Sequence, residues 1–315
     1  MGGLHHQDKV IFFDSSIKES MKIALGTVQF GINYGISNSL GQVKDTEAEK
    51  ILQYAFKQGV NTLDTASSYG NSEDVISDFL CKYSNGGYWN IITKTPNFKG
   101  SLIDNKQLDK SIESFKLSQK KLGEKNIYGL LIHNCNNLFL PGGEKLLHIL
   151  EGLKKKGVIK KIGVSLYSSE QIDFLLDNYS IDLVQLPVNI LDQRLIKNGR
   201  LDKLKKYNVE IHARSAFLQG LLLMPLDDIP SWFDPIKSVL KVFHKEAKER
   251  NMSILELALG FVQSIHEIDK VVVGVNSLDQ FKNIIDASSI NVNIDELSHL
   301  SVSDSRFLNP SNWRI

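Results

Sequence analysis

The chain is poor in cysteine and has no long apolar run. Its 315 residues include only two cysteines, Cys81 and Cys135, which lie in different segments without the CxxC or Cys/His spacing of a zinc site. We therefore expect neither a disulfide framework nor a bound metal, and a cytoplasmic location fits best. No run approaches the roughly 18 apolar residues of a membrane span, and the N-terminus lacks a signal-peptide pattern. Neither a membrane partner nor secretion is expected.

An excess of charge of one sign is also missing. The chain has 37 basic and 36 acidic residues, for a formal net charge of +1. No general electrostatic field is present to attract nucleic acid or an anionic membrane. The composition favours a small-molecule partner and predicts no particular oligomeric state.

Short β-branched or apolar runs alternate with amphipathic stretches from Met21 onward. This alternation predicts a parallel sheet with outer helices, and eight strands is the number of a closed (β/α)8 barrel. The expected strands are residues 22–27, 60–65, 90–94, 127–133, 162–165, 183–186, 209–214 and 271–275. The expected helices are residues 46–58, 71–81, 106–122, 143–156, 168–177, 235–250, 253–263 and 278–287.

An open doubly wound sheet is the competing architecture. It normally carries a GxGxxG turn after its first strand, and Gly26, Gly31 and Gly35 do not have that spacing. No linker rich in Pro, Gly or Ser divides the chain. We therefore expect one barrel domain over residues 21–315, with a C-terminal tail that contributes to the substrate pocket. Residues 1–20 are an extension, or a plug for one barrel end formed around residues 10–13.

Polar side chains follow three consecutive predicted strands. Asp64 and Tyr69 follow the second strand, Lys94 ends the third and His133 ends the fourth. Because the carboxyl ends of barrel strands share one rim, we expect the four side chains to converge there. Taken singly, Asp64 can cap a loop, Lys94 can be a surface charge, His133 a core histidine and Tyr69 a packing residue. Their joint arrival at one rim favours a catalytic unit.

These four residue types suit proton donation to a substrate oxygen. A phenol with a pKa of about 10 is a poor acid at neutral pH unless a positive charge stabilises the phenolate. An ammonium about 4 Å away, at an effective dielectric of about 20, can lower a tyrosine pKa by about 2 to 3 units. We therefore expect Lys94 to lower the pKa of Tyr69, Asp64 to pair with Lys94, and His133 to orient the substrate. Hydride must come from a cofactor, because no side chain donates one.

The chain resembles the aldo-keto reductase superfamily from Met21 to about Ile285. Residues 25–31 resemble the first-strand loop of the family, and residues 63–73 resemble its segment with the Asp and the Tyr. The resemblance implies a barrel oxidoreductase that binds NADPH or NADH extended across the rim. It also implies that Tyr69 is the general acid in carbonyl reduction, tuned by Lys94 and Asp64, and that His133 orients the carbonyl.

The same resemblance assigns residues to the cofactor. Ser165 and Gln185 match residues that hold the nicotinamide carboxamide, although Leu166 stands where the family often has Asn. Arg214 takes the position of an aromatic ring that stacks on the nicotinamide in many members, and a guanidinium can also lie flat on a ring. The set expected at the cofactor is Gly26, Thr27, Val28, Ser165, Gln185, Arg214, Ser215, Phe217, Gln219, Gly220, Gly274, Asn276, Gln280 and Asn283.

The residues expected at the adenosine end bear on the choice of nucleotide. Gly274 and Gln280 stand where many NADPH-specific members have Lys and Arg, so no bidentate phosphate fork is visible. From the resemblance we expect NADPH, with NADH as the other possibility.

Loops and the tail are expected to build the substrate pocket. We expect Phe30, Tyr34, Trp89 and Trp313 there, although both tryptophans can equally anchor the core. Such a lining suits a small aldehyde, ketone or sugar-like carbonyl. Two other functions stay open: a nucleotide-binding sensor or regulatory subunit with little turnover, and an aldolase in which Lys94 forms a Schiff base.

Overall fold

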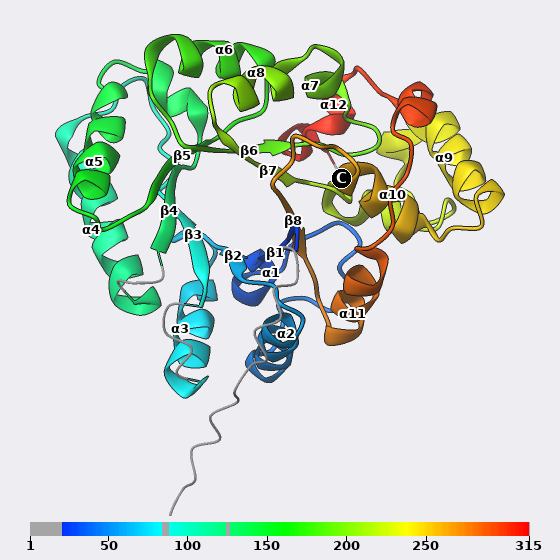
Figure 1. Ribbon diagram of the computed structural model, residues 1–315, viewed down its shortest axis with the longest axis horizontal. Helices are drawn as coiled ribbons and strands as arrows, with labels where there is room; N and C mark the ends of the chain where they lie inside the picture. The colour runs from blue at the N-terminus through cyan, green and yellow to red at the C-terminus, as the bar shows by residue number, and fades with distance from the viewer. Residues whose placement is uncertain (1–20, 84–87, 124–126, 315) are drawn as a thin grey trace, which may run out of the picture.

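The computed structural model describes residues 21–83, 88–123 and 127–314. Eight parallel strands close into a barrel in sequence order, and β8 pairs with β1 (Figure 1). The (β/α)8 barrel predicted from the sequence is confirmed, whereas the plug expected around residues 10–13 lies outside the described residues. The strands are β1 (Ile23–Gly26), β2 (Thr62–Asp64), β3 (Asn90–Lys94), β4 (Ile127–Ile132), β5 (Lys161–Ser165), β6 (Leu183–Pro187), β7 (Glu210–Arg214) and β8 (Lys270–Gly274).

The strand register brings the predicted polar residues to one rim. Asp64, the last residue of β2, pairs with Gly26 of β1 and with Ile92 of β3. Lys94, the last residue of β3, pairs with Leu131 of β4, and His133 directly follows β4. Parallel pairing therefore places all three side chains at the carboxyl ends of neighbouring strands, as the alternation predicted.

Helices surround the barrel (Figure 1). The predicted helices are found with shifts of one to two residues at most ends, and several begin with a capping box, such as Ser253 with Glu256 at the start of α10. The helices are α1 (Val28–Gly31), α2 (Asp45–Lys57), α3 (Ser72–Tyr83), α4 (Asn105–Leu122), α5 (Glu144–Lys155), α6 (Ser169–Asn178), α7 (Arg194–Lys197), α8 (Arg200–Lys206), α9 (Lys237–Glu249), α10 (Ile254–Gln263), α11 (Leu278–Ala287) and α12 (Ser305–Leu308).

The short helices α1, α7, α8 and α12 were not predicted. Between β6 and β7 the chain forms α7 and α8, separated by Gly199, which has a φ of 66°. This break, together with a high density of Lys and Arg, hides the helical period from the sequence. The predicted helix at residues 235–250 begins later than expected, at Lys237, because Pro235 belongs to the preceding 3-10 turn η3 (Ser231–Ile236).

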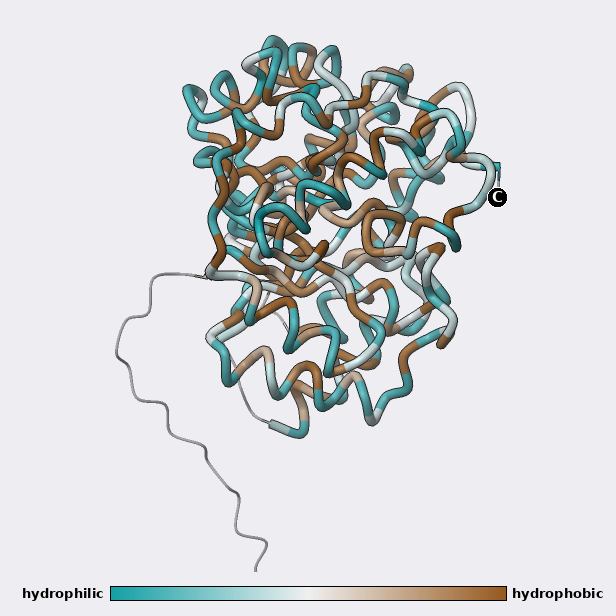
Figure 2. The backbone as a smooth tube through the Cα atoms, turned by 90° about the vertical axis from the view of Figure 1, so that its right-hand side faces the viewer, coloured by the Kyte–Doolittle hydropathy of each residue, from teal (hydrophilic) through white to brown (hydrophobic). Residues whose placement is uncertain are grey.

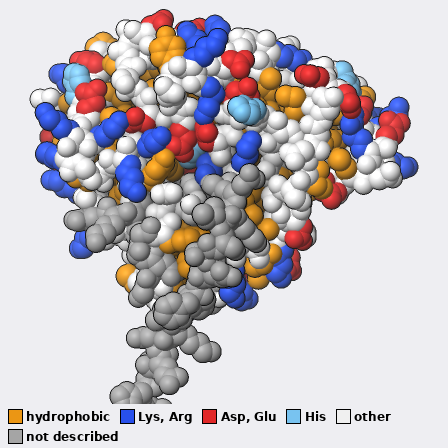
Figure 3. Space-filling model, viewed as in Figure 1, with side chains coloured by type: hydrophobic (Ala, Val, Ile, Leu, Met, Phe, Trp, Pro, Cys, Tyr) orange, Lys and Arg blue, Asp and Glu red, His pale blue; other side chains and the backbone are white. Residues whose placement is uncertain are grey.

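The core lies inside the barrel and between the strands and helices. Helix α2 illustrates the packing: its buried residues Ala48, Ile51, Leu52 and Ala55 recur every three or four positions and form one apolar stripe. Burial of a side chain such as Ile51 contributes roughly 1.5–3 kcal/mol, so a charge at this position would disrupt the helix–barrel contact. Figure 2 shows apolar stretches through the interior, and Figure 3 shows both signs of charge mixed over the visible face.

The described part of the chain contains neither a candidate membrane span nor a candidate metal cluster. Across residues 21–83, 88–123 and 127–314, no helix is at once long enough and apolar enough to cross a membrane. Nor do His, Cys, Asp and Glu side chains in these ranges gather into a group of three or more that could hold a metal ion.

Candidate active site

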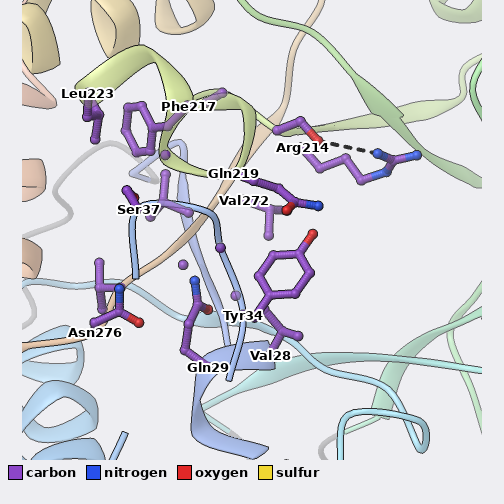
Figure 4. Close-up of a pocket in the computed structure, with 18 of the residues that line it drawn as sticks. Val28, Gln29, Tyr34, Ser37, Arg214, Phe217, Gln219, Leu223, Val272 and Asn276 are labelled. Carbon is purple, nitrogen blue, oxygen red and sulfur yellow. Dashed lines mark hydrogen bonds between the residues drawn. The ribbon is translucent and has the colours of Figure 1, made fainter. Parts of the chain in front are cut away.

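A cleft of about 730 Å³ opens at the carboxyl ends of the strands. It is lined by the loops after β1 and β7, by the ends of β5, β6 and β8, and by the first turns of α11. Its volume lies within the range of about 300–1,000 Å³ that is usual for ligand pockets. In Figure 4, Gln29 and Asn276 lie at one side of this cleft and Arg214 at the other.

A buried ion pair lies at the base of the cleft. The Lys94 ammonium donates to Asp64 Oδ1 at 2.8 Å, to Asp64 Oδ2 at 2.9 Å and to the Thr65 carbonyl at 2.8 Å. The side chains of Lys94 and Asp64 are 1% and 6% exposed, and Gln185 Nε2 donates to Asp64 Oδ1 at 2.7 Å. A buried charge this well paired is stable only with its partners in place. Gln185 therefore supports the ion pair as well as lining the cleft.

Tyr69 lies directly against this ion pair. The Lys94 ammonium is 5.0 Å from the centre of the Tyr69 ring, and Tyr69 lines the cleft. Burial raises the pKa of Tyr69 above its ordinary value, and the charge of Lys94 is the strongest opposing influence. Burial alone would lower the pKa of Lys94, but the Asp64 carboxylate and Tyr69 together raise it. Lys94 thus acts in the predicted direction, but burial outweighs it, and the pKa of Tyr69 lies above its ordinary value.

His133 completes the cluster as a neutral group. Its ring meets the Tyr69 ring edge-on, with centroids 5.9 Å apart, and Ser68 Oγ lies 3.5 Å from His133 Nδ1. Burial, helped by the Lys94 charge, lowers the pKa of His133 to about 4. The imidazole is therefore uncharged at pH 7 and can exchange a hydrogen bond with a substrate oxygen.

The position of Tyr69 is fixed by close backbone packing. A Cβ atom on Gly31 would overlap the Tyr69 carbonyl, and a Cβ on Gly70, where φ is 56°, would overlap the Gly31 carbonyl. Below this crossing, Thr27 Oγ1 donates to the Asp64 carbonyl at 3.0 Å, and Ser72 Oγ donates to the Thr27 carbonyl at 2.9 Å. Helix α1 and the start of α3 therefore hold the tyrosine loop from both sides.

Arg214 lies at the same end of the cleft as Tyr69 and His133. Its guanidinium carbon is 4.1 Å from the centre of the Tyr167 ring, and it donates to the Leu166 carbonyl and to Ser215 Oγ, each at 3.3 Å. Among the described residues no carboxylate forms an ion pair with it. The guanidinium therefore keeps donors for a ligand. Tyr167 was not predicted, although its place two residues after β5 is a strand-end signal.

The other end of the cleft presents unpartnered side-chain oxygens. Gln29 Oε1 and Asn276 Oδ1 are buried without a hydrogen-bond partner in the described structure, and Gln29 is only 8% exposed. A Cβ on Gly274 would overlap the Gln29 amide, so glycine makes room for it. Buried polar atoms without partners in a cleft of this size fit a polar ligand such as a nicotinamide dinucleotide. Gln29 was not predicted as a site residue.

The loops after β1 and β7 meet where they line the cleft. The Ile36 amide donates to the Gln219 carbonyl at 3.1 Å, and a Cβ on Gly220 would overlap Ser37. Ser215, Leu218 and Gln219 have φ values of 61°, 48° and 53°, a sparsely populated region for residues other than glycine. The β7 loop thus holds unfavourable backbone angles at the cleft, as ligand-binding loops often do.

The structure brings most of the predicted cofactor residues to this one cleft. Thr27 is the exception, because its side chain is buried in the contact between α1 and β2. Those that line the cleft are Gly26, Val28, Ser165, Gln185, Arg214, Ser215, Phe217, Gln219, Gly220, Gly274, Asn276, Gln280 and Asn283.

Of the four predicted substrate residues, the structure brings only Tyr34 to the cleft. Phe30 is fully buried in the core. Trp89 precedes β3 and packs at the amino end of the barrel against Tyr88, at a ring distance of 5.0 Å. Trp313 packs edge-on against Phe233 at 4.9 Å, and its indole nitrogen donates to a backbone carbonyl. Phe30, Trp89 and Trp313 therefore do not line this cleft, and no residue of the tail is among its described lining residues.

A parallel barrel whose catalytic rim carries an ion-paired lysine beneath a buried tyrosine is the framework of a barrel enzyme. A family model described as the aldo/keto reductase family matches residues 22–303, and the chain belongs to that family. It is therefore an oxidoreductase that uses NAD(P)H and acts on a small carbonyl substrate.

Relatives illustrate the range of the family. The chain is 27% identical over 257 residues to the D-arabinose 1-dehydrogenase of Saccharomyces cerevisiae, covering 76% of this chain and 75% of that protein. It is 24% identical over 270 residues to the NADH-specific methylglyoxal reductase of Escherichia coli, covering 76% and 81%. The structure of an aldo-keto reductase from Bacillus halodurans matches with a TM-score of 0.68 at 18% identity, covering 91% of this chain and 92% of that one. At that identity the structural likeness supports the fold alone.

Proposed function

We propose that this protein reduces a small aldehyde, ketone or sugar-like carbonyl to the alcohol, with a nicotinamide dinucleotide as hydride donor and Tyr69 as general acid. One observation carries the proposal: a buried ammonium, paired with Asp64, lies 5.0 Å from the centre of the ring of a tyrosine that lines the cleft. A phenol needs a fixed positive charge nearby if its proton is to leave at neutral pH.

The proton and the hydride go to different atoms of the carbonyl. The nicotinamide nucleotide, when bound, supplies the hydride that adds to the carbonyl carbon. The Tyr69 hydroxyl gives its proton to the carbonyl oxygen, which completes the alcohol and leaves a phenolate. The Lys94 ammonium stabilises that phenolate, while neutral His133 offers a hydrogen bond that orients the same oxygen.

The cleft residues support specific roles toward the nucleotide. Arg214 and Tyr167 form a cation–π pair beside the proposed catalytic cluster, which suits contact with the nicotinamide end. Gln29 and Asn276 offer acceptor oxygens at the far end. The resemblance favoured NADPH, with NADH as the other possibility, and the charges near α11 bear on this choice.

Two other functions are less well supported. A Schiff-base aldolase needs an uncharged amine, whereas three oxygen atoms accept from Lys94 and its pKa is raised. A nucleotide-binding sensor needs no proton donor, so a tyrosine positioned against a buried ammonium favours turnover over sensing.

The test is a panel of aldehydes, ketones and aldoses assayed in parallel with NADH and NADPH, together with direct titration of both nucleotides. We expect oxidation of at least one nucleotide by at least one carbonyl. Nucleotide binding without turnover of any carbonyl would favour the sensor. Trapping of a substrate on Lys94 by borohydride would favour the aldolase.

A further inference from the structure

The two ends of the cleft differ in chemical character. Assigning the nicotinamide to one end and the adenosine to the other rests on the proposed function. Hydride must reach a carbonyl held at Tyr69 and His133, so the nicotinamide lies at their end of the cleft. The rest of an extended dinucleotide then runs toward the opposite end, which is lined by Asn276, Gln280 and Asn283. The adenosine of the nucleotide is therefore placed beside the beginning of α11.

No cation lines this end of the cleft in the part of the chain that the structure describes. Arg214 is the one Lys or Arg among the described lining residues, and it lies against Tyr167 at the nicotinamide end. NADPH differs from NADH by a 2′-phosphate on the adenosine ribose, and a phosphate monoester carries a charge of about −1.5 to −2 at pH 7. Such a group is normally held by Arg or Lys side chains or by free backbone amides.

The amino terminus of α11 already holds a carboxylate. Glu47 Oε1, from α2, accepts from the Leu278 amide at 2.8 Å, and Ser277 Oγ accepts from the Gln280 amide at 3.2 Å. The hydrogen bond from Leu278 lowers the pKa of Glu47, so the group is charged at pH 7. Lys50 pairs with Glu47 Oε2 at 3.2 Å, but the two side chains are 61% and 29% exposed, so water weakens the pair. The helix end that could bind an anion is thus occupied and negatively charged.

The buried polar atoms that lack a partner at this end are acceptors. Gln29 Oε1 and Asn276 Oδ1 are buried without partners in the described residues, and the Gln280 side-chain oxygen accepts from the Asn276 amide at 2.8 Å. Ribose hydroxyls and the adenine amino group can donate to such oxygens. A phosphate dianion has only acceptor oxygens, so it gains no hydrogen bond from these atoms, and the neutral amide nitrogens of the lining Asn and Gln side chains are the donors left for it.

We propose that this protein binds NADH in preference to NADPH, and that Glu47 sets the preference by excluding the 2′-phosphate from the amino terminus of α11. The preference arises from repulsion of the wrong nucleotide as much as from contacts with the right one.

The test is a measurement of the Kd of NADH and of NADPH, by quenching of protein fluorescence at low salt, for the parent protein and two variants. Glu47→Gln removes the charge but keeps an oxygen for the Leu278 amide. Glu49→Gln is the matched control, because this carboxylate lies on the same helix but pairs with Lys82 of α3. We expect the parent to bind NADH at least about tenfold more tightly, and Glu47→Gln to bind NADPH about threefold better.

Each outcome decides one point. Equal or tighter binding of NADPH by the parent would overturn the preference and leave the proposed function intact. An unchanged NADH-to-NADPH ratio in Glu47→Gln, or an equal change in Glu49→Gln, would overturn the role of Glu47. Binding of neither nucleotide would overturn the proposed function itself.

Discussion

Polar and charged groups at the two ends of the barrel differ in whether the protein itself supplies their hydrogen-bond partners. At the amino end, Glu210 accepts from Tyr128 at 2.7 Å and from His212 Nε2 at 2.7 Å, and it pairs with Lys161 at 3.1 Å. Nearby, Asp269 pairs with Lys205 and accepts from a backbone amide of β7. The acids there are satisfied by the protein itself, although His212 Nδ1 and Trp89 Nε1 are buried without a partner in the described residues.

At the carboxyl end, one ion pair has all its partners within the protein, but the polar groups around it do not. Lys94 and Asp64 satisfy each other, whereas Arg214 has no acidic partner and Gln29 and Asn276 leave oxygens free in the part of the chain described. Spare hydrogen-bonding capacity in a cleft indicates that a ligand completes it. The amino end therefore contributes to stability, whereas the carboxyl end has the features of a binding and reaction site.

The largest effect is expected from removing the proposed general acid, Tyr69. We expect Tyr69→Phe to lower kcat by about 10²- to 10⁴-fold, because general acid catalysis contributes that much, while the Kd of the nucleotide stays nearly the same. Steady-state rates and fluorescence titration measure the two quantities. Tyr128→Phe, which removes the same hydroxyl at the amino end, is the control and should keep its activity. Equal rates in Tyr69→Phe and the parent would contradict the assignment.

The amino end should show the opposite response. Although burial alone would raise the pKa of Glu210, its partners lower it to about 2, so the carboxylate stabilises the fold above a pH of about 4.5 and loses this effect as the pH falls toward 2. We expect Glu210→Ala to lower the free energy of unfolding at pH 7 by roughly 2–4 kcal/mol, without changing kcat/KM. Urea unfolding and initial rates test this. A large loss of kcat/KM in a folded variant would break the division between the two ends.

Arg214 should affect binding more than chemistry. We expect Arg214→Ala to raise the Kd of the nucleotide by about tenfold, because a charge-assisted contact and a flat stacking surface are both lost, while the rate of hydride transfer falls less. Single-turnover kinetics separates the two effects. An unchanged Kd would remove Arg214 from the nucleotide site.

The smallest expected effect is on the pH dependence of stability. His133 has its pKa lowered from 6.5 to about 4, so below pH 6.5 the unfolded chain takes up the proton more readily than the folded protein. Folding stability should therefore fall as the pH drops from 6.5 to about 4. Between pH 6.5 and pH 5, the parent protein should lose on the order of 1 kcal/mol more of its free energy of unfolding than His133→Gln does. Urea unfolding measures this difference. Parallel stability profiles for parent and variant would show that burial does not hold His133 neutral.

Most of the fold could be predicted because alternation of strands and helices is a property of local sequence. The strands closed in the expected order, and each was found within two residues of its predicted bounds. Helices α7 and α8 could not be predicted, because Gly199 and dense basic residues interrupt their apolar period. The order of strands around the barrel then followed from rules of parallel connection.

The site was only partly predictable. Strand-end logic brought Asp64, Lys94 and His133 together, but the sign of the Tyr69 pKa shift depends on burial, which only the folded surroundings determine. Trp89 was misplaced for a reason visible in the sequence: it comes before β3, and so lies at the wrong end of the barrel. Gln29 was not predicted as a site residue, because an amide in a loop carries no signal until its lack of a partner is known.

The backbone crossing at Gly31 and Gly70 has a consequence for protein engineering. Even one added methyl group at either position would push the tyrosine loop away from α1 and separate the phenol from its ammonium. A library designed to widen substrate scope should therefore vary the rim around Tyr34 and leave these two glycines untouched. The close contact between these two glycines fixes the position of the Tyr69 loop relative to α1.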